Sequence, residues 1–247
     1  MKAVILAGGL GTRLSEETNT KPKPMVEIGG KPIIWHIMKI YSQHGINDFI
    51  ICCGYKGYVI KEYFNNYFLH QSDVTFHMSE NRMEVHDGRA EPWRVTLVDT
   101  GEHAQTGGRL LAVAEYIDRE EAFCLTYGDG VADVNIKKLY NFHKSKKNMV
   151  TLTAVRPPAR FGAIKIKKDR ISYFKEKSKI DVGWINGGFF IIEPDFFKYI
   201  KNDKTYLERE PLEKLTREKK LGAFKHKGFW KCVDSKRDLD NLKRELK

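Results

Sequence analysis

Short apolar runs alternate with amphipathic stretches along the first half of the chain. The compact, β-rich runs predict strands, and apolar residues that recur at helical spacing between them predict helices. The predicted strands are Lys2–Ala7, Asp48–Cys53, Val74–Met78, Val95–Asp99 and Ala122–Tyr127, and the predicted helices are Pro32–His44, Tyr58–Leu69 and Arg109–Ile117. Such alternation is typical of βαβ units. We therefore predict an α/β fold with a doubly wound, mostly parallel (Rossmann-like) mixed sheet and helices on both faces.

The pattern changes after residue 148, where strand-like runs follow one another with less helix between them. These runs are Val150–Val155, Ala163–Ile166, Ile171–Phe174 and Phe189–Ile192, and helices are predicted near Glu210–Lys219 and Ser235–Leu246. We expect the strands to extend the same sheet and to wall off one side of a site. The sequence has no evident linker. We therefore predict one domain over residues 1–247 with two halves, 1–148 and 149–247.

Charge and hydropathy narrow the class of protein. The longest apolar runs fall well short of the ~20 residues that a membrane-spanning helix needs. The net charge is +11, and residues 137–180 hold 14 lysines and arginines against two acidic residues. Such a basic segment suits small phosphorylated ligands together with a solvated, lysine-rich surface. No module of interleaved aromatic and basic residues accompanies it, so we expect neither a nucleic acid nor a membrane as partner.

The chain has four cysteines, Cys52, Cys53, Cys124 and Cys232, and no Cys-x-x-Cys pair. This spacing argues against a zinc site and against a disulfide framework. Three of the four lie in apolar runs, and we interpret these three as buried thiols. That usage fits a reducing compartment, so we expect a cytoplasmic protein.

A long loop follows the first predicted strand. It runs from Gly8 to Gly30, which is 23 residues, whereas loops between a strand and a helix ordinarily have about 2–6. Open α/β sheets bind ligands at the carboxyl ends of their strands, where this loop lies. It begins Gly8-Gly9-Leu10-Gly11-Thr12-Arg13-Leu14. Glycines let the backbone approach a phosphate closely, and successive N–H groups form an anion nest that the Arg13 guanidinium would supplement.

This glycine loop differs from two common phosphate-binding motifs. Leu14 stands where the dinucleotide-binding fingerprint has its third glycine. No Gly-Lys-Ser or Gly-Lys-Thr follows, as a P-loop requires. The loop alone therefore indicates a phosphate site without naming its ligand.

Further along, Lys21-Pro22-Lys23-Pro24-Met25 places one lysine between two prolines. The prolines stiffen the backbone on both sides of Lys23 and aim its side chain. The spacing leaves two interpretations open. In the first, Lys23 completes a cationic clamp on a polyphosphate with Arg13. In the second, it belongs to a solvated basic turn.

Several motifs follow one another in order along the chain. They are the glycine loop, the Lys21–Met25 segment, Ile28-Gly29-Gly30-Lys31-Pro32, Tyr127-Gly128-Asp129-Gly130, Phe174-Lys175-Glu176-Lys177 and Asn186-Gly187-Gly188. Together they resemble the signature of the sugar-nucleotide pyrophosphorylases, the nucleotidyltransferases that act on sugar 1-phosphates. The resemblance covers nearly the whole chain. It implies an enzyme that joins a nucleoside triphosphate to a sugar 1-phosphate, with residues 1–148 binding the nucleotide and 149–247 the sugar phosphate.

The resemblance implies roles for individual residues. For the nucleotide it implies Leu6, Ala7, Gly8, Gly9, Leu10, Gly11, Thr12, Arg13, Lys23, Thr106, Arg109 and Gly128. For the sugar phosphate it implies Gly162, Glu176, Lys177 and Asn186, although Ser178 replaces the proline that usually follows the Glu-Lys pair. It implies Arg13, Lys23 and Asp129 as catalytic residues, and Asp129 and Asp234 as ligands of Mg²⁺. Without the resemblance, Asp129-Gly130 would also suit a turn, and Arg109 a surface ion pair.

Other stretches resemble the members of this family that use CTP and α-D-glucose 1-phosphate. They are Gly54–Tyr58, Glu80–Val85, Glu91–Trp93, Val98–Gly101, Thr106–Arg109 and Gly228–Trp230. The resemblance implies CDP-glucose as product, a role in dideoxysugar synthesis for bacterial surface polysaccharides such as O-antigen, and a homo-oligomer. Two alternatives stay open: a thymidylyl- or uridylyltransferase, and a non-catalytic nucleotide-sugar-binding protein.

Overall fold

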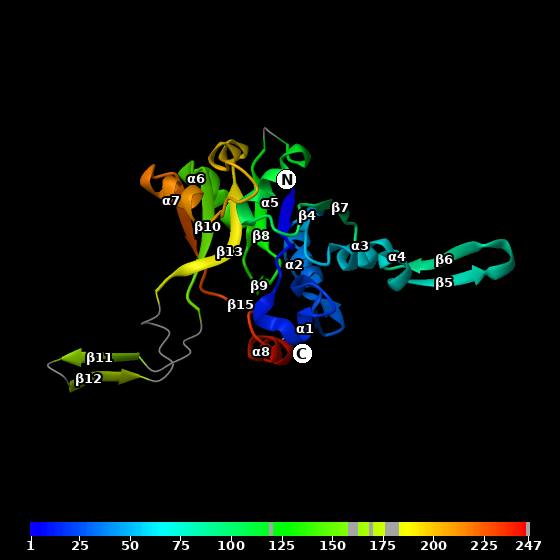
Figure 1. The fold of residues 1–247 in the computed structure, drawn as a ribbon, viewed down its shortest axis with the longest axis horizontal. Coiled ribbons are helices and arrows are strands. Elements are labelled where there is room, and N and C mark those ends of the chain that lie inside the picture. The colour runs from blue at the N-terminus through cyan, green and yellow to red at the C-terminus, as the bar shows by residue number, and fades with distance from the viewer. Residues whose placement is uncertain (119–120, 158–162, 168–169, 176–182, 246–247) are drawn as a thin grey trace.

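A seven-stranded sheet forms the centre of the computed structural model (Figure 1). The structure describes residues 1–118, 121–157, 163–167, 170–175 and 183–245. In spatial order the strands are β14 (Leu221–Lys225), β10 (Val150–Val155), β13 (Ile185–Ile192), β8 (Phe123–Tyr127), β1 (Ala3–Leu6), β4 (Asp48–Cys53) and β7 (Arg94–Asp99). Strand β13 is antiparallel to both neighbours, and the other neighbouring pairs are parallel. The predicted mostly parallel mixed sheet is confirmed.

Helices cover both faces of this sheet because its central strands are apolar on both faces. On β1, the side chains of Val4 and Ile5 are fully buried in two different core clusters, since successive side chains of a strand point to opposite faces. Side chains from α2 (Ile33–Ser42), α6 (Ile136–Lys146) and α8 (Lys236–Glu245) join Ile5, and side chains from α5 (Thr106–Ala112) and α7 (Glu210–Arg217) join Val4. The doubly wound arrangement is therefore confirmed.

Two strands that we expected to extend the central sheet lie outside it. In the described part of the chain, β11 (Ala163–Lys167) and β12 (Arg170–Lys175) pair with each other in a separate two-stranded sheet, well apart from the central one (Figure 1). The sequence of β11 alternates apolar residues with lysines. That alternation suits a ribbon with one solvated face, whereas strands inside a parallel sheet are apolar on both faces. The expectation for these two strands was wrong.

A second hairpin projects from the end of the helices α3 (Gly57–Asn65) and α4 (Tyr67–His70) (Figure 1). It consists of β5 (Ser72–His77) and β6 (Arg82–Gly88). Phe76 pairs with Met83 in its register, and their side chains are 53% and 45% exposed. The hairpin therefore presents apolar side chains to solvent.

Shorter elements carry the chain around the carboxyl ends of β1 and β8. They are the 3-10 turns Thr12–Leu14 and Lys23–Met25, the helix α1 (Ser15–Thr18), and the short strands β2 (Glu27–Ile28), β3 (Lys31–Pro32), β9 (Gly130–Ala132) and β15 (Trp230–Cys232). Among the helices that the structure describes, none has both the length and the apolar character that crossing a membrane requires.

Candidate active site

A cavity of about 810 Å³ opens at the carboxyl ends of β1 and β8. This is the edge of the sheet where the long first loop predicted a ligand site. The predicted residues in its wall are Leu6, Ala7, Gly8, Gly9, Leu10, Gly11, Thr12, Lys23, Thr106, Arg109, Gly128, Asp129, Asn186 and Asp234. Gly162, Glu176 and Lys177 lie outside the described residues, as does the side chain of Arg13. The two halves of the chain thus share one cavity.

Glycines in the first loop meet two local requirements. Gly11 has φ +64°, a conformation that side-chain-bearing residues rarely adopt. At Gly8 the space is taken, because an added Cβ would overlap the Arg109 guanidinium. The Gly11 carbonyl accepts hydrogen bonds from the Leu14 N–H at 2.9 Å and from the Thr18 hydroxyl at 3.2 Å. These contacts fold the loop back on itself and leave Gly9 and Leu10 exposed at the cavity.

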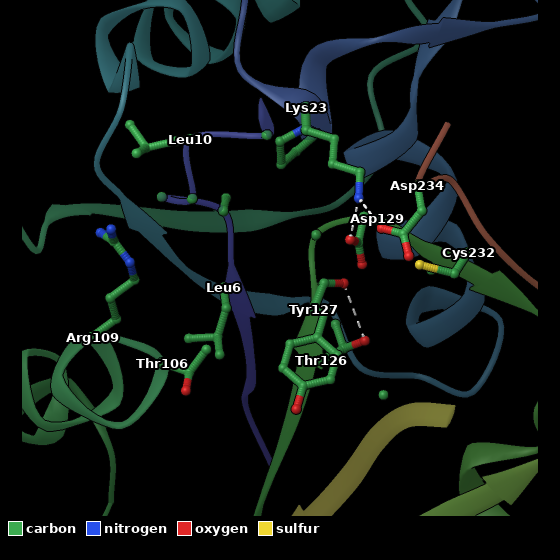
Figure 2. Close-up of a pocket in the computed structure, with 18 of the residues that line it drawn as sticks. Leu6, Leu10, Lys23, Thr106, Arg109, Thr126, Tyr127, Asp129, Cys232 and Asp234 are labelled. Carbon is green, nitrogen blue, oxygen red and sulfur yellow. Dashed lines mark hydrogen bonds and ion pairs between the residues drawn. The ribbon is translucent and has the colours of Figure 1, made fainter. Parts of the chain in front are cut away.

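Lys23 reaches from this loop to two carboxylates that are distant in sequence (Figure 2). Pro22 has extended backbone before it, and the Lys23–Met25 turn follows directly. The Lys23 ammonium donates to Asp129 Oδ2 at 2.6 Å and to Asp234 Oδ1 at 2.9 Å. Burial alone would lower the pKa of Lys23, but the charge of Asp129 and the hydrogen bonds to both aspartates raise it above its ordinary value. Lys23 is therefore a fixed cation in the cavity wall and not part of a solvated turn.

The positions of Asp129 and Asp234 suit a divalent cation. Asp129 lies two residues after β8, at the carboxyl end of that strand, and the N–H of Val233 donates to its carbonyl at 3.0 Å. The Asp129 and Asp234 side chains are 26% and 29% exposed, and both present an oxygen to the same ammonium. Carboxylate oxygens are the protein ligands that Mg²⁺ prefers. The two carboxylates therefore fit the Mg²⁺ that the family resemblance implies at Asp129 and Asp234.

Comparison with known proteins identifies the family. Residues 2–246 match the family model described as nucleotidyl transferase. The chain belongs to this nucleotidyl transferase family. The glucose-1-phosphate cytidylyltransferase of Salmonella typhimurium is 65% identical over 238 residues, which cover 96% of this chain and 93% of that protein. The probable glucose-1-phosphate cytidylyltransferase of Bacillus subtilis is 43% identical over 240 residues, with coverages of 97% and 93%.

Solved structures share the fold of this nucleotidyltransferase. HddC from Yersinia pseudotuberculosis aligns with a TM-score of 0.71 at 24% identity, covering 100% of this chain and 99% of that one. A UDP-glucose pyrophosphorylase complexed with UDP-glucose aligns with a TM-score of 0.70 at 18% identity, covering 99% and 97%. At these identities the likeness concerns the fold alone. It supports the assignment of the central sheet and its helices to the nucleotidyltransferase architecture.

Arg109 holds the cavity wall of the nucleotidyltransferase together. Its side chain is buried, and its guanidinium donates to the Thr100 hydroxyl at 2.8 Å, the Gly101 carbonyl at 2.6 Å and the Glu102 carbonyl at 2.9 Å. Burial lowers the pKa of Arg109 from its ordinary value. The guanidinium also packs against Gly8 and thereby joins the glycine loop to residues 100–102. A contact between Arg109 and a nucleotide base stays a prediction.

Replacing Arg109 by methionine is expected to lower the free energy of unfolding by about 2–4 kcal/mol, because the buried Thr100 hydroxyl and the Gly101 and Glu102 carbonyls lose their donor at once. For a chain of this length, that corresponds to a fall of roughly 4–16 °C in the thermal midpoint. Differential scanning calorimetry measures it. Arg82→Met is the matched control, since the Arg82 side chain is 50% exposed. Equal midpoints for the two variants would show that Arg109 does not hold the wall.

Glu208 lines the cavity and links other residues of its wall, and sequence reasoning missed it. Its carboxylate accepts hydrogen bonds from the Tyr127 hydroxyl at 2.6 Å and from the Thr106 hydroxyl at 2.7 Å. The Asn186 amide donates to the Tyr127 oxygen at 3.2 Å. Burial and the neighbouring Glu208 raise the pKa of Tyr127, so its hydroxyl stays protonated. This network joins a predicted nucleotide residue, Thr106, to a predicted sugar-phosphate residue, Asn186.

Other cavity residues also went unpredicted. Glu102, His103, Gln105, Trp230 and Cys232 line the cavity. The Trp230 indole donates to the Gly187 carbonyl at 2.7 Å. Of these residues, Trp230 lies in a motif quoted for its resemblance to enzymes that use CTP, and that signal was available from the sequence. The remaining ones carry no local pattern that distinguishes them from surface residues.

Proposed function

We propose that this nucleotidyltransferase transfers the cytidylyl group of CTP to α-D-glucose 1-phosphate, giving CDP-glucose and pyrophosphate. The observation that carries the reaction type is the Lys23 ammonium, held beside two carboxylates at the foot of a glycine loop. The choice of CTP and glucose 1-phosphate is supported by the 65% identity to the Salmonella typhimurium glucose-1-phosphate cytidylyltransferase. The sequence motifs that resemble family members using CTP and glucose 1-phosphate support the same substrates.

The residues around the cavity suit an in-line transfer without a general base. A sugar 1-phosphate is a dianion near neutral pH, so its oxygen attacks the α-phosphorus without losing a proton. The bond from the α-phosphorus to the bridging oxygen breaks, and pyrophosphate leaves with the electron pair. Alignment of the two reactants contributes about 7–11 kcal/mol to lowering such a barrier. The remaining task is to stabilise negative charge on the leaving group, for which Lys23 and Arg13 are suited.

The two halves of the chain divide the substrates between them in this proposal. The glycine loop, Thr106 and Arg109 form the nucleotide side of the cavity. Asn186 belongs to the sugar-phosphate side, together with Gly162, Glu176 and Lys177, which remain predictions. The Glu208 network joins the two sides. We therefore propose that the nucleotide and the sugar phosphate meet beside the Tyr127 hydroxyl.

We propose Mg²⁺ as the cofactor. Asp129 and Asp234 would hold it, because their oxygens face a common cation position now shared with Lys23. When bound, the ion neutralises phosphate charge and polarises the α-phosphate. Lys23 is then available to the triphosphate, since its two partners have another cation to neutralise.

The expected base preference is CTP over UTP. Cytosine presents an amino donor at the position where uracil presents a carbonyl acceptor, and a site that accepts from the amino group leaves its acceptor unpaired against uracil. Such an unpaired buried group costs about 1–3 kcal/mol, which is roughly 10- to 100-fold in kcat/KM. Residues 102–106 line this part of the wall. Steady-state rates with each triphosphate measure the ratio, and dTTP separates the thymidylyltransferase alternative. Equal kcat/KM for CTP and UTP would defeat the cytidylyltransferase proposal and leave the family assignment intact.

The state of the cysteines bears on the cellular compartment. The four cysteines form no disulfide with one another, which supports the reducing cytoplasm as the compartment.

We further propose a homo-oligomer. The apolar side chains exposed on the β5–β6 hairpin support it, since an isolated two-stranded hairpin is marginally stable in water. Sedimentation equilibrium is expected to give a multiple of the 28.6 kDa chain mass. A single species of the chain mass at all concentrations would contradict it.

A further inference from the structure

Cys232 lies beside the two carboxylates of the proposed cation site. One ligand atom from each of Asp129, Cys232 and Asp234 lies within 4.8 Å of the others, the one such group of metal-ligating side chains among the residues that the structure describes. The Cys232 sulfur points toward the same space as both carboxylates (Figure 2). Mg²⁺ prefers oxygen ligands, so the proposed reaction makes no use of this thiol. The thiol therefore adds to the two carboxylates a possible metal ligand that the proposed reaction does not need.

The pairing of two short strands fixes the three donors. Cys232 on β15 pairs with Gly130 on β9, directly after Asp129. The hydrogen bond from the Val233 N–H to the Asp129 carbonyl continues this pairing by one residue. Side chains two residues apart on an extended chain share a face, and Val233 between them is fully buried on the other. Cys232 and Asp234 therefore face the cavity together with Asp129.

We propose that Asp129, Cys232 and Asp234 form a three-donor site for a thiophilic divalent cation of the Zn²⁺ and Cd²⁺ class. The inference rests on the cation site of the proposed function and adds a sulfur ligand to it. Soft thiolate ligands select such cations over Mg²⁺. Catalytic zinc sites typically have three protein ligands and one open coordination position. Their metal–ligand bonds of about 2.0–2.3 Å place the donor atoms roughly 3–4 Å from one another. On binding, the thiol proton passes to solvent and the sulfur ligates as thiolate.

Lys23 competes for this site in the absence of nucleotide. Its ammonium is 2.6 Å from Asp129 Oδ2 and 2.9 Å from Asp234 Oδ1, so a cation that uses both carboxylates has to displace it. Lys23→Met keeps most of the side-chain length and removes the competing charge. Cation binding is therefore tested in the wild type and in Lys23→Met protein side by side.

The test titrates Cd²⁺ into nucleotide-free protein that is kept reduced with a phosphine. It records the ultraviolet absorption of sulfur-to-metal charge transfer, together with the calorimetric affinity, and repeats the titration with Mn²⁺. The decisive variant is Cys232→Ser. The matched control is Cys124→Ala, which removes a thiol that is fully buried in the core. Circular dichroism establishes that each variant is folded.

The expected result is a charge-transfer band in the wild type and in Cys124→Ala that Cys232→Ser lacks. The Cd²⁺ affinity of Cys232→Ser should fall by at least about 100-fold, since even outer-shell partners of a metal contribute about 10- to 100-fold. The Mn²⁺ affinity should change little. The sulfur ligand is ruled out if the charge-transfer band persists in Cys232→Ser. It is also ruled out if the wild type binds Mn²⁺ but shows no charge-transfer band with Cd²⁺. Neither result contradicts the proposed cation site of the two carboxylates. If neither cation binds the wild type or Lys23→Met, the proposed cation site fails as well.

Discussion

Asp129→Asn is expected to lower kcat/KM by about 10²- to 10³-fold or more, the range typical for loss of one group that stabilises transition-state charge. The amide keeps the shape of the side chain but carries no charge to hold a divalent cation. It also removes the carboxylate that the Lys23 ammonium contacts at 2.6 Å. Steady-state pyrophosphate release measures the change. Because the Asp129 side chain is 26% exposed and lies in the cavity wall, we expect the fold to survive.

Asp133→Asn is the matched control for this substitution. It makes the same change of charge a few residues along the chain, where the carboxylate is 62% exposed and pairs with His226 at 2.9 Å. We expect its activity to stay close to that of the wild type. If Asp129→Asn retained the activity of Asp133→Asn, or if the wild type kept full activity in excess chelator, the proposed role of Asp129 would be wrong.

Lys23→Met is expected to lower kcat/KM by roughly 10²-fold or more, because one preorganised positive charge beside the phosphates is lost. The same variant should bind Mn²⁺ more tightly than the wild type when no nucleotide is present. The reason is that its two carboxylates no longer share their charge with an ammonium. One substitution therefore moves activity and cation affinity in opposite directions.

Lys21→Met is the control for Lys23→Met. Lys21 is two residues away and pairs with the exposed Glu27 at 3.1 Å. Isothermal titration with Mn²⁺ and steady-state kinetics together test both halves of the prediction. A folded Lys23→Met protein with normal kinetics would remove Lys23 from the catalytic residues. Unchanged Mn²⁺ affinity would instead show that its ammonium does not compete for the carboxylates.

The fold and the place of the site could be predicted because their signals are local. Apolar runs with helical stretches between them predict the order of the central elements, and a long loop rich in glycine and proline marks the carboxyl end of the first strand. The stiff Pro-Lys-Pro segment predicts that Lys23 is aimed, and the structure places it in the cavity wall. These features depend on neighbours in sequence, which periodicity and turn chemistry describe.

Membership of a sheet is not local, and there the sequence misled. The strands β11 and β12 have strand periodicity, but whether they pair with the central sheet depends on partners elsewhere in the chain. Glu208 was missed for a similar reason. It stands in a charged stretch that resembles a solvated helix start, and only the fold brings it to Tyr127 and Thr106.

Cys232 shows the limit most clearly. Its spacing from the other cysteines argues against a zinc site, yet its neighbours in space are carboxylates rather than thiols. Asp129 reaches it through the pairing of β9 with β15, two strands of three residues each. Motif spacing along the chain cannot reveal a ligand set that is assembled across two such short strands.

The most direct test of the proposed transfer follows CTP labelled at its α-phosphorus in the presence of glucose 1-phosphate and Mg²⁺. The account predicts that the label appears in CDP-glucose, with one pyrophosphate released for each CDP-glucose formed. Label that appears in CMP would show hydrolysis instead of transfer. A folded protein that binds CDP-glucose but turns over none of the labelled CTP would be a nucleotide-sugar-binding protein, and that result would contradict the account.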